Sequence, residues 1–312
     1  MTTTTQTSLR QARNFVNIIG YLKKKDLELK TNRNGVEMIT GTLTVMTEEG
    51  SEHVVRIMKS RLKSDGQPNK TYPGFLTVMN EYVSMADLMD IGKPLEEAMA
   101  QCSIVDVKGN LTRNEYVSQQ TDEFVSTPAV SCSSATRLAP GAKFTPKAIF
   151  ELECYIKSIA PEFKNGEDTG RLVVSAIIPV YGGQVIPFEF VVGAEVADDF
   201  QSCYEAGCTA MLNGDLINRV EVTSSRASGF GRQMDHNTFV REFLICGGLP
   251  PYDEGDAKVF SSEAIAAAML VRENETIPAI RERNQQQATT SFSAQRPVSN
   301  PAIAQAAAGF TY

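Results

Sequence analysis

The cations of residues 56–70 are the most distinctive group in the sequence that could do chemistry. This segment holds a single acid, Asp65, and five cations: Arg56, Lys59, Arg61, Lys63 and Lys70. Tyr72 and Phe75 follow directly. Lysine and arginine neutralise phosphates, and aromatic rings stack on unpaired bases. The segment therefore predicts phosphate contacts by the cations and stacking by Tyr72. The alternative is a solvated loop, and Phe75 itself is expected in a helix core.

Arg226, Phe230 and Arg232 form a second basic and aromatic motif, in which the phenylalanine stands between two glycines. A phenylalanine in a glycine-rich polar loop has no evident core to fill. Base stacking is one interpretation, and an oligomer contact or simple anchoring is the other. The first half holds a weaker copy of the motif in Arg113, Tyr116 and Phe124.

Two tyrosines on expected first strands are each followed two residues later by a lysine. The pairs are Tyr21 with Lys23 and Tyr155 with Lys157. All four are candidate nucleic-acid contacts. A tyrosine that is half-buried in its strand is an equally good interpretation of Tyr21 and Tyr155.

No catalytic or metal-binding pattern stands out in the sequence. It has no GxxxxGK[ST] loop, no HExxH motif and only two histidines, His53 and His236. The six cysteines contain no CxxC pair, and Cys102, Cys154 and Cys246 lie in apolar runs typical of buried thiols. We therefore expect no enzymatic activity, no cofactor, no metal and no disulfides.

Apolar residues follow a strand pattern in five segments of each half, with a helical pattern between the third and fourth. The first-half strands are expected at 14–22, 36–46, 52–58, 102–107 and 125–138, with a helix at 72–89. The second-half strands are expected at 148–159, 172–180, 185–192, 210–222 and 239–246, with a helix at 196–204 and a loop at 224–237. The repeated order indicates an internal duplication. It predicts a mainly β protein of two tandem OB-fold five-stranded Greek-key barrels, followed by a disordered C-terminal tail.

The same pattern divides the chain into expected parts. These are a flexible leader at 1–12, a first OB-like domain at 13–143, a second at 144–255, a short helical segment at 256–284 and a disordered tail at 285–312. Gln, Ala, Ser, Thr and Pro dominate the tail, a composition typical of disorder.

Charge is distributed unevenly along the chain, whose net charge is −7. Lysine and arginine outnumber acids in the first 150 residues, and the acidic excess lies in the remainder. No run of 18 apolar residues occurs, and the polar N-terminal residues do not resemble a secretory signal. We therefore expect a cytoplasmic protein, not bound to a membrane, whose first half can present a basic surface.

Four segments together resemble a family of phage and mobile-element proteins. They are Phe15-Val-Asn-Ile-Ile-Gly-Tyr-Leu, Gly74-Phe-Leu-Thr-Val-Met-Asn-Glu-Tyr, Ala148-Ile-Phe-Glu-Leu-Glu-Cys-Tyr-Ile-Lys-Ser-Ile and Asp168-Thr-Gly-Arg-Leu. The similarity spans residues 14–255. That family is regarded as tandem OB-fold proteins that bind single-stranded DNA, so the resemblance implies a replication or recombination accessory. Bacterial single-strand binders usually end in an acidic tip, whereas this chain ends Gly-Phe-Thr-Tyr.

The sequence thus predicts a sequence-independent single-stranded-DNA-binding protein, located in the host cytoplasm if it is phage-encoded. Replication or recombination proteins and a second copy of the chain are candidate partners. The alternative is a phage structural or assembly protein that uses its barrels as protein-interaction modules, which suits the acidic second half and the nearly uncharged tail.

Overall fold

The computed structural model describes residues 9–226 and 233–283, with the backbone alone at 221–226 and 233–238. The contacts within the chain divide it into two compact units. One is Met1–Arg113 with Thr127–Leu270, and the other is Asn114–Ser126 with Val271–Tyr312. The predicted tail at 285–312 and most of the predicted leader lie outside the described residues.

The first barrel consists of β1 (Asn14–Thr31), β2 (Glu37–Glu48), β3 (Ser51–Ser60), β4 (Ile104–Val117) and β5 (Phe124–Arg137). β1 pairs antiparallel with both β2 and β4, and β2 pairs antiparallel with β3. A short parallel pairing of Val55 on β3 with Val130 on β5 closes the barrel. This is the five-stranded Greek-key arrangement of the OB-fold.

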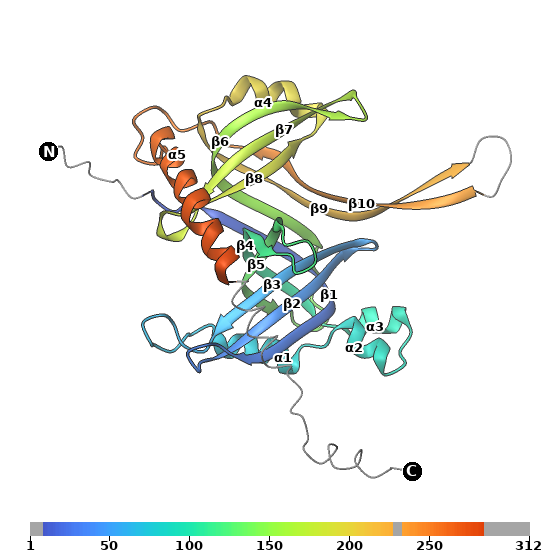
Figure 1. Cartoon of the computed structure of the whole chain (residues 1–312). Coiled ribbons are helices and arrows are strands. Elements are labelled where there is room, and N and C mark those ends of the chain that lie inside the picture. The colour runs from blue at the N-terminus through green and yellow to red at the C-terminus, as the bar shows by residue number, and fades with distance from the viewer. Residues whose placement is uncertain (1–8, 227–232, 284–312) are drawn as a thin grey trace, which may run out of the picture. The chain divides into compact units, whose positions relative to one another are not determined.

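The second barrel repeats this arrangement (Figure 1). Its strands are β6 (Lys147–Lys164), β7 (Glu167–Pro179), β8 (Val185–Val192), β9 (Thr209–Arg226) and β10 (Gln233–Gly248). The closing parallel pair joins Val191 on β8 to Leu244 on β10. β1 also pairs antiparallel with β6, from Asn14 opposite Leu152 to Ile19 opposite Lys147, so one ladder joins the barrels. The prediction of two tandem OB-fold barrels is confirmed.

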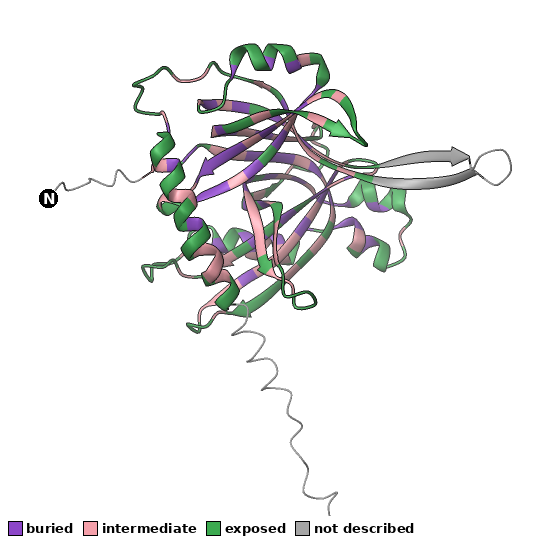
Figure 2. Cartoon of the chain, turned by 45° about the horizontal axis from the view of Figure 1, so that its top comes forward, coloured by how far each residue is buried: buried purple, intermediate pink, exposed green. Residues whose placement is uncertain are grey.

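Side-chain alternation builds both cores. On β3, Val55 and Ile57 point inward and are buried, while Val54, Arg56 and Met58 point outward. Figure 2 shows buried residues along the inner faces of the curved strands. Burial of this apolar set is the main driving force for the fold.

Each barrel carries its helices between strands three and four, as predicted. In the first barrel they are α1 (Tyr72–Glu81), α2 (Met85–Asp90) and α3 (Leu95–Gln101). In the second barrel they are the short turn η2 (Ala194–Val196) and α4 (Ala197–Cys203), and a further short turn, η1 (Tyr181–Gly183), lies between strands two and three.

The prediction of one helix over 72–89 is wrong. Ser84 Oγ accepts a hydrogen bond from the Asp87 amide at 3.2 Å, and the Asp87 carboxylate accepts one from the Ser84 amide at 2.8 Å. This capping box starts a new helix.

Two glycines permit the close backbone approach that the coiled strands need. A Cβ on Gly20 of β1 would lie 2.3 Å from the Met46 carbonyl oxygen, and one on Gly214 of β9 would lie 1.9 Å from the Leu244 carbonyl oxygen. A side chain at either place would force the strands apart. β1 also has a register shift between Leu22 and Lys24.

The second barrel ends in strands that are longer than predicted. β9 and β10 pair continuously from Gly214 opposite Ile245 to Arg226 opposite Gln233, so the ends of the predicted loop at 224–237 are strand. A bulge lies between Ile245 and Gly247, and Cys246 there is exposed rather than buried. Cys102 and Cys154 are buried, as predicted.

The N-terminal residues are bound to the second barrel by a buried carboxylate. Arg10 donates through Nη1 and Nη2 to the two carboxylate oxygens of Glu153, at 2.7 and 2.8 Å. The Arg13 amide donates to the same carboxylate at 3.1 Å, and the Arg10 guanidinium lies 4.2 Å from the centroid of the Phe260 ring. Charge-assisted bidentate bonds of this kind are among the stronger polar contacts in proteins.

A C-terminal helix begins as α5 (Ser262–Val271) and continues through the π-helical turn η3 (Arg272–Thr276) to residue 283. In the second unit, Arg272 forms a buried ion pair with Glu115 of β4. Within the described part of the chain, no helix combines the length and apolar character required to cross a membrane.

Candidate nucleic-acid interface

The outer face of β1, β2 and β3 is polar and half-exposed. Directly opposite residues share a face, and one row across the sheet joins Asp26, Thr42 and Arg56. The other rows are Lys24–Thr44–Val54, Glu28–Thr40–Met58 and Lys30–Met38–Ser60. Threonines therefore line the centre of this face, which is the face that OB-folds use for oligonucleotides.

On this outer face, Lys24 and Lys30 of β1 are compensated by acids of the same strand, whereas Arg56 of β3 has no such partner. Lys24 lies 2.7 Å from Asp26, and Lys30 lies 2.5 Å from Glu28. Among the described residues, Arg56 has no carboxylate within ion-pair distance. Met58 beside it is 73% exposed and Val54 is 51% exposed. The sequence analysis did not identify these two apolar side chains. To place them on this face, the alternation of β3 has to be combined with its register against β2.

The chain after β3 forms a small basic hairpin (residues 61–70). An antiparallel bridge joins Leu62 to Pro68, and the Lys63 amide donates to the Gln67 carbonyl at 2.8 Å. The Asn69 side chain donates to the Ser60 carbonyl at 2.9 Å, which ties the hairpin to the end of β3. Arg61, Lys63 and Lys70 are exposed on it, and none has a carboxylate partner within the described ranges. Because these contacts fix the hairpin backbone, the backbone loses little freedom when the cations meet phosphates.

Two residues of the predicted basic segment belong to packing rather than to the exposed surface. Lys59 is half-buried, its Nζ lies 5.2 Å from the centroid of the buried Phe75 ring, and burial lowers its pKa. Tyr72 is only 4% exposed, and its hydroxyl donates to Glu37 Oε1 at 2.6 Å. The stacking role predicted for Tyr72 is therefore wrong, because its ring is buried. Phe75 lies in the core, as predicted.

The structure does not bring the tyrosine–lysine pairs to the basic hairpin. Tyr21 is half-buried and contacts Phe144 edge-to-face at 5.4 Å, and Lys23 pairs with Glu52. Tyr21 lies opposite Met46, whereas the hairpin follows the row of Met38, so about 27 Å of strand separates them.

The second pair lies on another strand. On β6, Tyr155 is half-buried against the main core, and Lys157 is exposed at a register shift between Ile156 and Ser158.

The second predicted motif falls mostly beyond what the structure describes. Phe230 and Arg232 lie outside the described residues, and of Arg226 only the strand backbone is described. Nearby, Phe239 on β10 is 67% exposed and lies opposite Val220 on β9. Sequence reasoning missed Phe239 because it assigned this residue to a final core strand.

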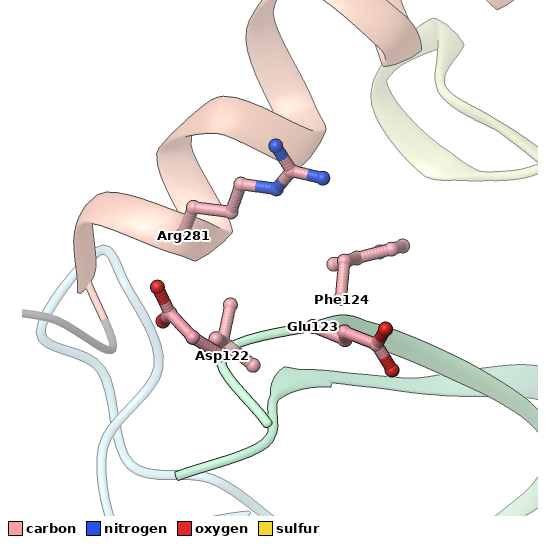
Figure 3. A pocket seen from close by; sticks show the side chains of 5 residues that line it. Asp122, Glu123, Phe124 and Arg281 are labelled. Carbon is pink, nitrogen blue, oxygen red and sulfur yellow. The ribbon is translucent and has the colours of Figure 1, made fainter. Parts of the chain in front are cut away.

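Of the weaker copy of that motif, Arg113 and Phe124 are engaged in protein contacts, whereas Tyr116 is exposed. Arg113 Nη1 donates to the Pro187 carbonyl at 3.1 Å. In the second unit, Arg281 lies over the Phe124 ring at 6.0 Å, beside a pocket of about 530 Å³ that Asp122 and Glu123 also line (Figure 3). Two acidic residues in its lining make this pocket a poor phosphate site.

His53 is a buried titratable group on β3. Its Nε2 lies 3.3 Å from Thr47 Oγ1, and burial lowers the pKa of its imidazole to about 4. Within the described residues, no group of three or more His, Cys, Asp or Glu side chains could hold a metal. The imidazole is therefore a neutral, packed group at physiological pH.

Acid should destabilise the protein through His53. The unfolded imidazole protonates near pH 6.5 and the folded one only near pH 4. Unfolding therefore takes up a proton in this window, and the free energy of unfolding should fall by about 3 kcal/mol as the pH drops through it, at 1.36 kcal/mol per pKa unit. Urea unfolding at pH 7 and pH 4.5 measures this. His53→Gln should flatten this part of the profile, whereas an equally steep profile in that variant would contradict the assignment.

Comparison with known proteins gives a family and similarities to solved structures. The family model YorF matches residues 12–283. The crystal structure of wild-type single-stranded DNA binding protein from Thermus aquaticus has a TM-score of 0.43 and 13% identity, over 78% of this chain and 95% of that one. A deletion mutant of the same protein has a TM-score of 0.42 and 14% identity, over 78% and 97%. None of the curated proteins matches. Since the family model covers most of the length of this chain, the chain belongs to the YorF family.

Proposed function

We propose that this protein binds single-stranded DNA without sequence preference, as an accessory in replication or recombination. The outer face of β2 and β3 and the basic hairpin would form the main contact. This face is where an OB-fold barrel presents its strands to oligonucleotides. The proposal includes no catalytic step and no cofactor.

One observation carries the proposal. Arg56, Arg61, Lys63 and Lys70 project from adjoining parts of the first barrel, and within the described ranges no carboxylate pairs with any of them. Lys24 and Lys30 on the outer face of neighbouring β1 are by contrast paired with acids of the same strand. A local run of uncompensated cations attracts phosphates even when the net charge of the protein is negative.

Stacking contacts would come from exposed side chains on this face and on the second barrel. Met58 and Val54 supply apolar surface beside Arg56, and Phe239 supplies an exposed ring on β10. Base stacking on an aromatic ring is worth about 1–3 kcal/mol per base and tolerates any sequence. Single strands expose base faces, whereas a duplex hides them.

A direct test compares single strands with duplexes. Fluorescence anisotropy of a labelled oligo(dT) should rise on addition of the protein. A duplex of equal length should compete poorly, because its bases are not available for stacking. Equal competition by duplex DNA, or no binding of oligo(dT), would refute the proposed function.

A second candidate function, a module for protein assembly, is favoured by one surface. α2, α3 and the turn between them expose the apolar side chains of Met89, Ile91, Leu95 and Met99. Exposed apolar side chains gathered in one region often mark protein contacts. Light scattering on nuclease-treated protein separates the two functions, since ordered assembly without nucleic acid would favour the second.

A further inference from the structure

A cleft of about 390 Å³ lies where β3 and β5 meet β9 and β10. Its volume falls in the range of about 300–1,000 Å³ that holds small ligands. The apolar part of its lining includes Val54, Pro128, Ala129, Ile217 and Phe243. Residues far apart in the sequence form it, so no sequence motif marks it.

The aromatic wall of the cleft is rigid. The ring of Phe243 lies edge-on to Phe188 at 4.9 Å and also contacts Phe150 at 6.4 Å. Phe188 and Phe150 are fully buried, while Phe243 is half-buried. A ring held in this way keeps its exposed part in one place, which suits contact with another flat group.

The polar edge of the cleft presents one oriented cation. Arg241 Nε donates to Asn218 Oδ1 at 3.2 Å, which fixes the guanidinium and leaves its Nη groups free to donate. Arg241 is exposed and has no carboxylate partner in the described part of the chain. Glu242, which also lines the cleft, is neutralised by Arg171, whose Nη1 donates to Glu242 Oε1 at 3.2 Å. The cleft therefore offers a positive group without a free negative one.

Two strands connect the cleft to the surfaces already described. Val54 in its wall lies two residues from Arg56, on the same face of β3. On β10, the alternate positions of Phe239, Arg241 and Phe243 place an aromatic, a cation and an aromatic on one face. A single strand that follows Arg56 would thus reach the cleft within two residue spacings.

We propose that this cleft receives one unstacked base of a bound single strand, with the base against Phe243 and Val54 and Arg241 donating to an adjoining phosphate. A base has apolar faces and polar edges, which match the apolar wall and the polar rim. This inference rests on the proposed function, and it adds that the second barrel contributes directly to binding.

The absence of tryptophan from the chain allows a clean test. Val54→Trp places a single indole in the cleft wall at a position that is already half-exposed, and Ala129→Trp places one on β5 should the first variant fold poorly. Tyr181→Trp is the matched control, since Tyr181 is 85% exposed and does not line the cleft. Unlabelled oligo(dT) is the probe, and anisotropy of a labelled oligo(dT) reports binding independently.

Stacking of a base should quench the cleft tryptophan over the same concentration range in which anisotropy rises, and should leave the control tryptophan unchanged. Arg241→Gln should weaken oligo(dT) binding several-fold. Binding by anisotropy without quenching at either cleft position would overturn the cleft proposal and leave the proposed function standing. No binding by anisotropy in the wild-type protein would overturn both.

Discussion

Reversing the charges of the basic hairpin should nearly abolish single-strand binding. In the variant Arg61→Glu, Lys63→Glu, Lys70→Glu, three phosphate contacts are lost and three repulsions replace them. We expect affinity for oligo(dT) to fall at least about 100-fold in low salt, and the slope of log affinity against log salt to shrink by about 2, at 0.7 per contact. The three side chains are exposed, so the fold should persist. Lys59 is left intact because it packs on Phe75.

A matched variant separates local charge from net charge. Lys108, Lys143 and Lys258 are also exposed, and they lie outside the proposed interface. Reversing them changes the net charge of the protein by the same amount. Binding close to wild type in this control is expected. Equal loss in both variants would show that only the overall charge matters, and would remove the hairpin from the interface.

Removing the Glu153 carboxylate should cause a large loss of stability. Glu153→Ala leaves Arg10 without its bidentate partner and the Arg13 amide without its acceptor. Breaking a buried pair costs about 3–5 kcal/mol. Because the Arg10 side chain is 34% exposed, we expect a smaller loss in the free energy of unfolding, about 2–3 kcal/mol, measured by urea denaturation.

A double-mutant cycle with Arg10→Ala isolates the pair. The double variant should be less destabilised than the sum of the single variants, since removing both partners leaves no lone buried charge. If the two single losses in the free energy of unfolding add up to the loss in the double variant, the ion pair itself contributes nothing to stability.

The pH dependence gives a second check on Glu153. Burial alone would raise the pKa of Glu153, but hydrogen bonds from Arg10 and the Arg13 amide outweigh it and hold the pKa below its ordinary value. The contribution of the Glu153 carboxylate to the free energy of unfolding is therefore complete above the ordinary pKa range of a carboxyl group. It is lost as the pH falls through the lowered pKa of Glu153 in the folded protein. This window lies below the one assigned to His53, so the two can be separated.

The order of the strands was predictable because each strand carries its own alternation of apolar and polar residues. Both halves of the chain show this alternation in the same order of elements, and from this order the duplication and the OB-fold were predicted. The helix break at Ser84 was not found, because apolar spacing continues across it while a capping box starts the new helix. The true length of β9 and β10 was not found either, since polar residues near Arg226 have the composition of a loop.

The candidate site was only partly predictable for a similar reason. Arg56, Arg61, Lys63 and Lys70 could be identified from composition, because charge clustering is a local property. The burial of Tyr72 depends on Glu37, which is 35 residues away, and no local signal reports that contact. The cleft depends on Val54, Ala129, Asn218 and Arg241, which meet only after both barrels close.

The salt dependence of oligo(dT) binding tests the central claim most directly. Anisotropy titrations of the wild-type protein at 50 and 200 mM salt give the slope of log affinity against log salt. Each phosphate contact with a single strand lowers this slope by about 0.7, so contacts from the four exposed cations predict a slope near −3. A flat profile, or an affinity for duplex DNA equal to that for oligo(dT), would contradict single-strand binding through these cations.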